Sequence, residues 1–433
     1  MHYSEIKILD TKEYEAGFVV EATVRDKENY FCPYCESTKL KNHANKTISL
    51  RDAPYGNKPV LLIIQRYRLQ CLNCTKTFYT PLSFIDERRH VTISCVKSIL
   101  NASFKQSFVQ VAQTHGVDEK TVRNIFNEYI ASINDKVERQ LPSVMGIDEV
   151  HLGGEYRCTI SNLQENLLFD FLESRKKSSL TKFCEEYKDQ LASVKLVCMD
   201  LWLPYKQMVK QNMPNAIIVA DRFHVQRMAT NALESARKHV RRGLTQREKL
   251  ALKDDRKLIL MNIERLDIKS MQRLMDLLDR FPLLKKLWAA KEQFNSFWDM
   301  ETKNEASEIY QDFLASLDDE AKFYFKDLIT AMQNWQAEIF NYFVYNRITN
   351  AATETLNREI GRKYDMGYGY SFASLRNKLL YTPQGADYSS GYSIQNIDKL
   401  ISKGIRLDVA NSVLNQILRY DHNKCNNYDE LED

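Results

Sequence analysis

Residues 194–221 read VKLVCMDLWLPYKQMVKQNMPNAIIVAD. Two short apolar runs, Val194–Asp200 and Ala216–Asp221, flank a segment, Trp202–Met213, with helical spacing of its apolar residues. Each apolar run ends on an aspartate, Asp200 or Asp221. The order strand, helix, strand is typical of α/β domains, in which helices cover the faces of a sheet. The stretch therefore predicts an α/β core with carboxylates at the ends of its strands.

The residues before this stretch extend the same sheet. Three apolar runs joined by short polar links predict an antiparallel meander of three strands: Val144–His151, Glu155–Leu163 and Leu167–Glu173. A helix is expected over Ser179–Leu191, and another begins at Phe223. The order βββαβαβα predicts a mixed sheet with helices on its faces.

Three aspartates within this pattern are candidates for chemistry. Asp148 lies inside the first strand, and Asp200 and Asp221 end the fourth and fifth. Carboxylates among Val, Ile and Met are costly unless a positive charge compensates. Hard oxygen ligands at one sheet edge suit Mg²⁺ or Mn²⁺. Core ion pairs are the alternative interpretation.

A later segment offers a fourth acid. Residues 346–363 are expected to form a helix whose one face carries Asn350, Glu354 and Asn357 at i, i+4 and i+7. Such a helix fits across the sheet edge, with Glu354 reaching the metal ions and Arg362 and Lys363 reaching phosphate. A solvated helix face gives the same spacing.

Residues 225–340 predict a helical block, because Gly243 and Pro282 are its only breakers. Its charge is polarised. Residues 237–257 hold nine basic residues, Arg241 and Arg242 among them, against three acidic ones, and residues 299–320 hold eight acids against one lysine. The basic half is a candidate DNA contact, although solvated helix faces also explain the charges.

Near the start of the chain, Cys32-Pro-Tyr-Cys35 and Cys71-Leu-Asn-Cys74 share one spacing. Two such pairs on hairpins supply four thiolates to one tetrahedral Zn²⁺. Four thiolates leave no open coordination position, so the expected zinc is structural. Unrelated core cysteines would not explain two identical spacings.

The region around the cysteines is basic. Residues 31–123 contain 14 Lys and Arg, including Arg66 and Arg68, against six acids. The phosphate backbone of a nucleic acid is the obvious partner of such a surface. A basic surface that only meets solvent is the alternative.

Residues 107–126 indicate DNA as the nucleic acid. They predict a helix with Val109 and Ala112 facing inward, a turn at Gly116, and a second helix capped by Asp118. The N-terminal half of the second helix would present four side chains to the major groove: Lys120, Thr121, Arg123 and Asn124. An ordinary helical hairpin is the alternative.

Several classes of protein are excluded by what the sequence lacks. It has no P-loop, no complete dinucleotide-binding fingerprint, no GxSxG elbow and no HExxH pair. With 13 glycines and nine prolines in 433 residues, it is not collagen-like or low-complexity. No membrane span or signal peptide is expected, which favours a cytoplasmic protein with reduced cysteines.

Taken in order, these motifs resemble the DDE transposases of bacterial insertion sequences, in the subgroup with an N-terminal zinc ribbon and helix-turn-helix. The likeness runs from about residue 30 to 380. It is carried by the two cysteine pairs and by these stretches: Gly146-Ile-Asp148-Glu149, Met199-Asp-Leu-Trp202 with Pro204-Tyr205, Ala220-Asp-Arg-Phe-His224, and Asn350-x3-Glu354-x2-Asn357 followed by Gly367-Tyr368.

The resemblance implies a multidomain α/β protein with an RNase H-like core interrupted by the all-helical insertion. It makes Asp148, Asp200 and Glu354 the catalytic triad, with Asp221 as a neighbouring or alternative acid. Two Mg²⁺ or Mn²⁺ ions held by the triad would support cleavage at the element ends and transfer of the 3′-OH to target DNA. The implied partners are the terminal repeats and target DNA, bound by a homodimer on paired ends. Neither a nucleotide cofactor nor a membrane is implied, and the expected location is the nucleoid-associated cytoplasm of a bacterium.

The expected boundaries are 1–85 for the zinc ribbon, 86–140 for the helix-turn-helix, 141–224 for the first part of the core, 225–340 for the insertion, 341–384 for the last core helix and 385–433 for a helical tail. Two other functions stay open: a non-catalytic DNA-binding regulator derived from a transposase, and an RNase H-fold nuclease without strand transfer.

Overall fold

The structure, a computed structural model, describes residues 3–25, 30–134, 139–367 and 369–381. It falls into two compact units. The first comprises the chain up to Arg139 together with the segment from Arg362 onward, and the second comprises Gln140–Gly361. The predicted tail at 385–433 lies outside the described residues.

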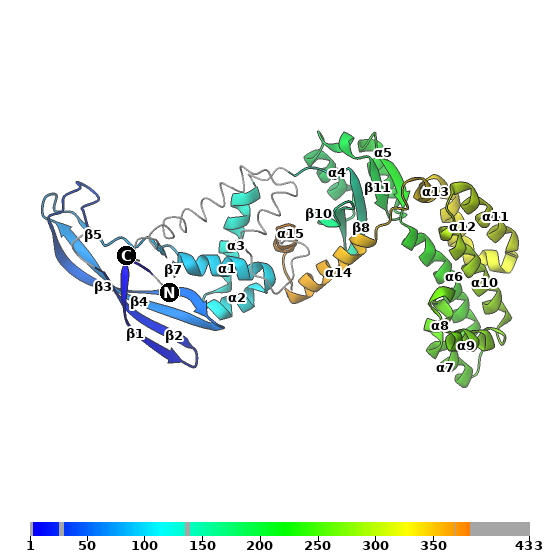
Figure 1. Ribbon diagram of the computed structural model, residues 1–433, viewed down its shortest axis with the longest axis horizontal. Coiled ribbons are helices and arrows are strands. Elements are labelled where there is room, and N and C mark those ends of the chain that lie inside the picture. The colour runs from blue at the N-terminus through cyan, green and yellow to red at the C-terminus, as the bar shows by residue number, and fades with distance from the viewer. Residues whose placement is uncertain (1–2, 26–29, 135–138, 368, 382–433) are drawn as a thin grey trace, which may run out of the picture. The chain divides into compact units, whose positions relative to one another are not determined.

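A long antiparallel ribbon, β3 with β4, is the framework of the first unit (Figure 1). On β4, Val60, Leu62 and Ile64 alternate with more exposed residues and are fully buried, as the period of a half-buried strand requires. The sheet order is β1-β2-β4-β3-β7-β6, and β5 pairs with β4. The strands are β1 (Ile6–Tyr14), β2 (Gly17–Val24), β3 (Leu40–Tyr55), β4 (Lys58–Cys71), β5 (Thr77–Tyr79), β6 (Ile85–Asp86) and β7 (Val91–Thr92).

Three helices follow: α1 (Ile93–Lys105), α2 (Phe108–His115) and α3 (Glu119–Asn134). They confirm the predicted helix-turn-helix, with Gly116 in the left-handed region at φ 64° between α2 and α3. One detail of the prediction is wrong, because Val109 is 51% exposed whereas Val111 is fully buried. Ser107 caps α2, so the core-facing positions begin at Phe108 and continue at Val111 and Ala112.

Helix α15 (Phe372–Leu380) also belongs to the first unit. Its Lys378 is fully buried, and its ammonium donates to the backbone oxygens of Ser103 and, over 2.9 Å, Gln106. The same ammonium lies 4.2 Å from the centre of the Phe108 ring. Burial, with repulsion from Lys363, lowers the pKa of Lys378 to about 7. The end of the expected catalytic segment 341–384 therefore packs with the helix-turn-helix.

The second unit is built on the predicted mixed sheet, and the prediction is confirmed. Its order is β10-β9-β8-β11-β12, in which β8 pairs antiparallel with β9 and parallel with β11. The antiparallel meander thus passes into parallel strands, giving the RNase H-like core. The strands are β8 (Val144–Leu152), β9 (Glu155–Asn162), β10 (Leu167–Leu172), β11 (Leu196–Met199) and β12 (Ile217–Ala220).

Helices cover both faces of this sheet (Figure 1). Side chains of α4 (Lys177–Glu186) and α5 (Leu203–Asn212) contribute to its core, and a 3₁₀ turn, η1 (Leu191–Ser193), leads into β11. The other face receives α14 (Ala351–Met366). The approach of α14 is close at Gly146, where a Cβ would lie 2.3 Å from Ser161 Oγ and 2.6 Å from Thr353 Oγ1.

The helix predicted over 346–363 begins later than expected. Asn346 and Arg347 have φ of 51° and 52°, so α14 starts only at Ala351. These two residues turn the chain in the left-handed conformation that asparagine tolerates better than most residues. Asn350 consequently precedes the helix instead of lying one turn inside it.

The all-helical insertion is confirmed between β12 and α14. Pro282 stands at the first position of α10, where its missing N–H costs nothing, and Gly243 ends α6. A cluster of fully buried rings, Phe294, Phe297 and Trp298 among them, joins the insertion to the sheet in one continuous core. The helices are α6 (Arg222–Arg242), α7 (Gln246–Asp254), α8 (Arg256–Leu260), η2 (Ile263–Arg265), α9 (Ile268–Leu278), α10 (Pro282–Ser296), η3 (Phe297–Asp299), α11 (Lys303–Ser316), α12 (Asp319–Asn334) and α13 (Gln336–Val344).

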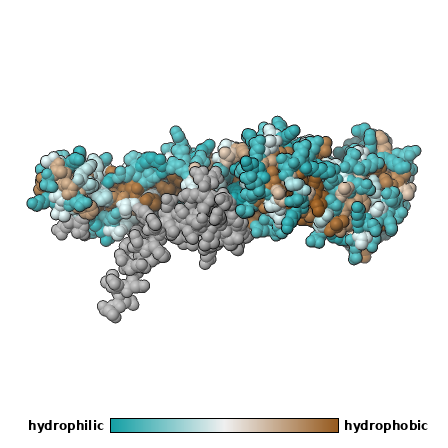
Figure 2. Space-filling model, turned by 90° about the horizontal axis from the view of Figure 1, so that it is seen from above, coloured by the Kyte–Doolittle hydropathy of each residue, from teal (hydrophilic) through white to brown (hydrophobic). Residues whose placement is uncertain are grey.

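Hydrophilic residues dominate the face seen in Figure 2, and hydrophobic residues reach the surface in separate patches. Within the described ranges, no helix has the length and apolar character that crossing a bilayer requires.

Candidate active site and zinc site

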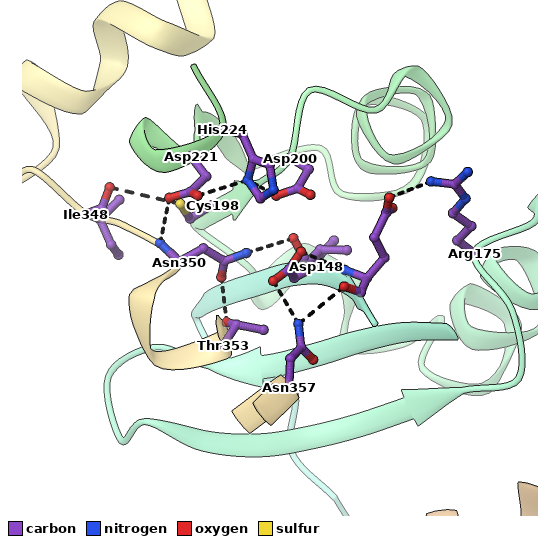
Figure 3. Close-up of polar contacts among 12 residues, drawn as sticks. Asp148, Arg175, Cys198, Asp200, Asp221, His224, Ile348, Asn350, Thr353 and Asn357 are labelled. Carbon is purple, nitrogen blue, oxygen red and sulfur yellow. Dashed lines mark hydrogen bonds and ion pairs between the residues drawn. The ribbon is translucent and has the colours of Figure 1, made fainter. Parts of the chain in front are cut away.

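Two of the predicted aspartates and one histidine come together at the end of the core strands. Ligand atoms of Asp148, Asp200 and His224 all lie within 4.8 Å of one another. Asp148 comes from β8, Asp200 directly follows β11, and His224 lies in the first turn of α6 (Figure 3). Because β8 and β11 are parallel neighbours, their aspartates meet at one edge of the sheet, as the sequence predicts.

Asp148 is held by two hydrogen bonds. Its Oδ1 accepts from the backbone N–H of Glu149 over 2.7 Å, and its Oδ2 accepts from Asn357 Nδ2 over 2.8 Å (Figure 3). The carboxylate is only 4% exposed. Burial, together with the negative charge of Asp200, raises the pKa of Asp148. The site therefore holds two carboxylates that repel each other.

His224 lies between two carboxylates. Its Nδ1 is 2.7 Å from Asp200 Oδ1 and 3.1 Å from Asp221 Oδ2. Burial alone would lower the pKa of His224, but hydrogen bonds and charges from Asp200 and Asp221 outweigh it and raise the pKa to about 10. The two carboxylates therefore favour the charged form of the imidazole.

Asp221 has both of its oxygens engaged. Oδ2 meets His224, and Oδ1 accepts from the backbone N–H of Asn350 over 3.0 Å. The residue is 1% exposed, so its carboxylate faces other protein groups and not the solvent. The structure thus places Asp221 beside the Asp148–Asp200–His224 cluster and outside it.

Glu354 lies apart from the cluster. It is half-buried on α14, and its carboxylate is not among the ligand atoms that converge within 4.8 Å. Burial and the charge of Asp221 raise the pKa of Glu354, whereas His224 and Arg227 lower it. These influences locate Glu354 within electrostatic reach of the cluster.

The donor set fits a hard divalent cation. Two neighbouring carboxylates that repel each other gain from a positive ion, and carboxylate oxygens are the ligands that Mg²⁺ and Mn²⁺ prefer. Beside Asp148, the buried Oε2 of Glu149 has no hydrogen-bond partner among the described residues. A cation or a hydrogen-bond donor bound beside the two carboxylates would satisfy this buried oxygen.

The four cysteines of the two pairs also come together. Their sulfurs all lie within 4.8 Å, with Cys32 Sγ 3.5 Å from Cys74 Sγ and Cys35 Sγ 3.6 Å from Cys71 Sγ. Four sulfurs at ~2.3 Å from one ion would be separated by about 3.8 Å in a tetrahedron. The cluster fits a structural Zn²⁺ with no open position. Cys32 and Cys71 are fully buried, so the site closes the open end of the β3–β4 ribbon.

Helix α3 presents the side chains expected of a recognition helix. Lys120, Arg123 and Asn124 are exposed, whereas Thr121 is half-buried. The buried face of α3 is formed by Val122, Ile125, Phe126 and Ile130. Arg123 forms an ion pair with Glu119 one turn earlier.

The other basic residues predicted to contact DNA differ in how far their side chains already bind protein groups. Arg66 has an 11% exposed side chain that pairs with Glu87 and donates to Thr80 O, and Arg68 donates to Thr77 Oγ1. Arg241 donates to Lys249 O. Arg242 and Arg362 are exposed, and the ammonium of Lys363 donates to Lys378 O.

Two site residues escape sequence reasoning from carboxylates alone. His224 stands three residues after Asp221 at a helix start, a spacing that allows both side chains to meet. Arg175 pairs with Glu149 on the side of Asp148 away from Asn350 (Figure 3), and nothing in its sequence context signals this.

Comparison with known proteins identifies the three parts. A family model described as a transposase, the DDE domain of the ISL3 group, matches residues 145–379. A zinc finger of the IS204/IS1001/IS1096/IS1165 transposases matches residues 29–74, and the helix-turn-helix domain of transposase family ISL3 matches residues 80–130. The transposase for insertion sequence element IS1001 of Bordetella parapertussis is 21% identical over 273 residues, which are 62% of this chain and 67% of that protein.

Proposed function

The chain belongs to the ISL3 family of transposases, and on that premise we propose that it binds the terminal inverted repeats of its insertion sequence, cleaves the DNA at the element ends and joins the freed 3′-OH ends to target DNA. The observation that carries the proposal is the convergence of Asp148, Asp200 and His224 within 4.8 Å at the edge of the core sheet. The paired ends are bound by a homodimer.

Asp148, Asp200 and Glu354 are proposed to hold two Mg²⁺ or Mn²⁺ ions. When bound, the ions would activate the attacking oxygen and stabilise the leaving oxygen of an in-line displacement. The chain supplies the orientation: Asn357 fixes Asp148, and His224, itself held by Asp221, fixes Asp200. Glu354 precedes Asn357 by one helical turn on α14, so one helix carries the third acid and the anchor of the first.

The DNA is proposed to be recognised by the first unit and gripped by the second. Lys120, Thr121, Arg123 and Asn124 on α3 would read the terminal repeats. Arg68 of the ribbon, Arg241 and Arg242 of the insertion, and Arg362 with Lys363 would add phosphate contacts. The guanidinium of Arg66 is already engaged by Glu87 and Thr80, so its proposed role is to hold the ribbon in place. No external energy source is needed, since one phosphodiester replaces another.

The test is incubation of the protein with a labelled terminal-repeat duplex, Mg²⁺ and a target plasmid. Joined product supports the proposal. Cleavage without joining favours a nuclease, and specific binding with neither favours a regulator. Replacing Asp148, Asp200 or Glu354 by Ala should abolish chemistry and leave end binding intact, while Glu185→Ala on the exposed face of α4 should keep both.

Asp221 tests the assignment of the third acid. If Glu354→Ala remains active and Asp221→Asn is inactive with its fold intact by thermal melting, Asp221 and not Glu354 completes the triad.

A further inference from the structure

An arginine is stacked between two aromatic rings beside the acidic cluster. The guanidinium carbon of Arg175 lies 4.1 Å from the centre of the Tyr156 ring and 4.4 Å from that of Trp202. Tyr156 belongs to β9, and Trp202 is two residues beyond Asp200. We call these three residues the aromatic–arginine stack.

The stack is tied directly to the candidate active site. Arg175 Nη1 lies 2.5 Å from Glu149 Oε1, and Glu149 is the neighbour of Asp148 in the chain. The backbone N–H of Arg175 donates to Tyr156 O over 3.3 Å. The stack therefore has a fixed position next to the carboxylates.

Its rings are open to solvent to an unusual degree. Trp202 is 37% exposed and Tyr156 is 46% exposed. The chain has four tryptophans, and the other three, Trp288, Trp298 and Trp335, are at most 8% exposed. Apolar rings at a surface next to a reaction site are typical of ligand contact.

The chemistry of the stack fits a nucleotide. Aromatic rings bind nucleobases by stacking whatever their sequence, and a guanidinium binds phosphate. Among the described residues, only Nη1 of the Arg175 side-chain nitrogens has a hydrogen-bond partner. Nε and Nη2 remain available to an anionic oxygen.

The nucleotide must be unpaired. In a duplex, both faces of each base are already covered by neighbouring bases, so a protein ring can stack only on a base that has left the helix.

We propose that the aromatic–arginine stack binds one unpaired nucleotide next to the phosphodiester that is cut, with the base on Trp202 and the phosphate on Arg175. This inference rests on the proposed function, because it takes the acidic cluster as the cleavage site. It makes Trp202 and Arg175 DNA-binding residues of the core, in addition to those of the helix-turn-helix.

The experiment uses the full chain and terminal-repeat duplexes with 2-aminopurine at single positions on either side of the cut. Binding is carried out with Ca²⁺ in place of Mg²⁺, and cleavage is then measured with Mg²⁺ on unlabelled duplex. The variants are Trp202→Ala, Trp202→Phe and Arg175→Lys. Trp335→Phe is the matched control, since Trp335 stacks on Lys206 at 4.4 Å but is buried.

We expect 2-aminopurine emission at one position to change when the wild-type protein binds, and this change to be different with Trp202→Ala, because the emission depends on which ring the base stacks. Cleavage by Trp202→Ala should fall on the order of 10-fold to 100-fold, whereas Trp202→Phe and Trp335→Phe should stay within about threefold of wild type. A mismatch at the same position should restore much of the activity of Trp202→Ala, because the base then needs no unpairing. A merely structural role of Trp202 would not respond to the mismatch.

An unchanged emission signal in Trp202→Ala, or a cleaving wild-type protein without any signal, overturns the inference and leaves the proposed function standing. Emission that depends on Trp202 without cleavage in Mg²⁺ supports base binding and contradicts the proposed function. If Trp202 instead becomes buried when the protein concentration is raised in the absence of DNA, the stack belongs to a contact with a second copy of the chain. That result would also overturn the inference.

Discussion

The side-chain amide of Asn357 donates a 2.8 Å hydrogen bond to Oδ2 of Asp148, joining α14 to β8 across 209 residues of sequence. The bond fixes one of the two buried carboxylates from the helix that also carries Glu354. Asn357 Oδ1 in turn accepts from Thr159 Oγ1 over 2.6 Å, which sets the direction of the amide.

Asn357→Ala should therefore lower cleavage by about 10-fold to 100-fold, as the loss of a group that orients a metal ligand commonly does. Asn357→Asp should lower it further, because it adds a negative charge beside Asp148. Rates are measured on a terminal-repeat duplex. Thr355→Ala, on the exposed side of α14, is the control and should be unchanged. Wild-type rates in Asn357→Ala would contradict the role of the bond.

Gly146→Ala should disrupt the seating of α14 on the sheet. The added methyl group would meet Ser161 Oγ at 2.3 Å and Asn350 Oδ1 at 2.5 Å, and overpacking of this kind costs about 1–3 kcal/mol. We expect a lower melting temperature and lost cleavage. Gly361→Ala on α14 is the matched control: a Cβ there meets nothing within 4 Å, so this variant should gain up to about 1 kcal/mol. Equal stability of the two variants would refute the close approach.

Glu234 should make the insertion sensitive to acid. It binds the 5% exposed side chain of Arg237 over 2.8 Å and that of Arg256 over 3.0 Å. The hydrogen bond from Arg237 is the main cause that lowers the pKa of Glu234 to about 2, below its ordinary value of 4.5. A depressed carboxylate pKa stabilises the fold above the unfolded pKa, and this contribution is lost between about pH 4.5 and 2.

Glu234→Gln should accordingly lower the free energy of unfolding by about 3 kcal/mol at pH 7, because it leaves Arg237 buried without its partner. The difference from wild type should shrink towards pH 2–3. Urea unfolding followed by tryptophan emission reports it, since Trp288, Trp298 and Trp335 lie in the core of the insertion. Asp254→Asn, at the exposed end of α7, should show no such loss. A pH-independent difference would rule out the ion pair as its source.

Basic side chains of the first unit should separate into DNA contacts and structural ones. Lys120→Ala should weaken end binding and reduce the salt dependence of the affinity by about one ion, and Asn124→Ala should relax sequence preference. Arg66→Ala should mainly lower thermal stability, because its guanidinium is occupied by Glu87 and Thr80. Fluorescence anisotropy at several salt concentrations distinguishes the two effects. A large affinity loss in a stable Arg66→Ala would reverse this division.

Zinc should be required for DNA recognition. Cys35→Ser should lower the zinc content below one per chain and reduce end affinity on the order of 10-fold or more, since metal binding and folding of such a ribbon are one process. Elemental analysis and anisotropy measure the two quantities. Cys184→Ala, which changes a thiol in the core of the second unit, should keep both at wild-type values. Full zinc content in Cys35→Ser would exclude Cys35 as a ligand.

Much of the fold follows from local pattern. The strands around Asp200 and Asp221, the meander before them and the glycine turn of the helix-turn-helix are predicted because apolar spacing and turn residues agree there. The start of α14 is not predicted correctly, since Asn346 and Arg347 adopt left-handed conformations that residue type alone does not demand. The inward orientation predicted for Val109 is wrong, because the core-facing positions of α2 are Phe108, Val111 and Ala112.

Only those residues of the candidate active site whose charge stands out from an apolar strand could be predicted from the residues themselves. Carboxylates at strand ends stand out from their apolar surroundings, and so Asp148, Asp200 and Asp221 could be named. The contacts that Asn357 and His224 make with these carboxylates, and the pairing of Arg175 with Glu149, could not be predicted, because they form between segments far apart in the sequence. The charge of the basic run at 237–257 is a poorer guide to exposure, since Arg237 at its start is buried against Glu234.

The hydrogen bond from the Asn350 N–H to Asp221 Oδ1 joins the point where the insertion leaves the core to the point where it rejoins the core. A second hydrogen bond near these points runs from Asn341 Nδ2 to Ile218 O over 2.8 Å. The separation of those points is thus set by the core itself and is independent of how much chain runs between them. A change of length or charge within α7, α8 or α9 should therefore leave the positions of Asp148, Asp200 and Asp221 unaltered.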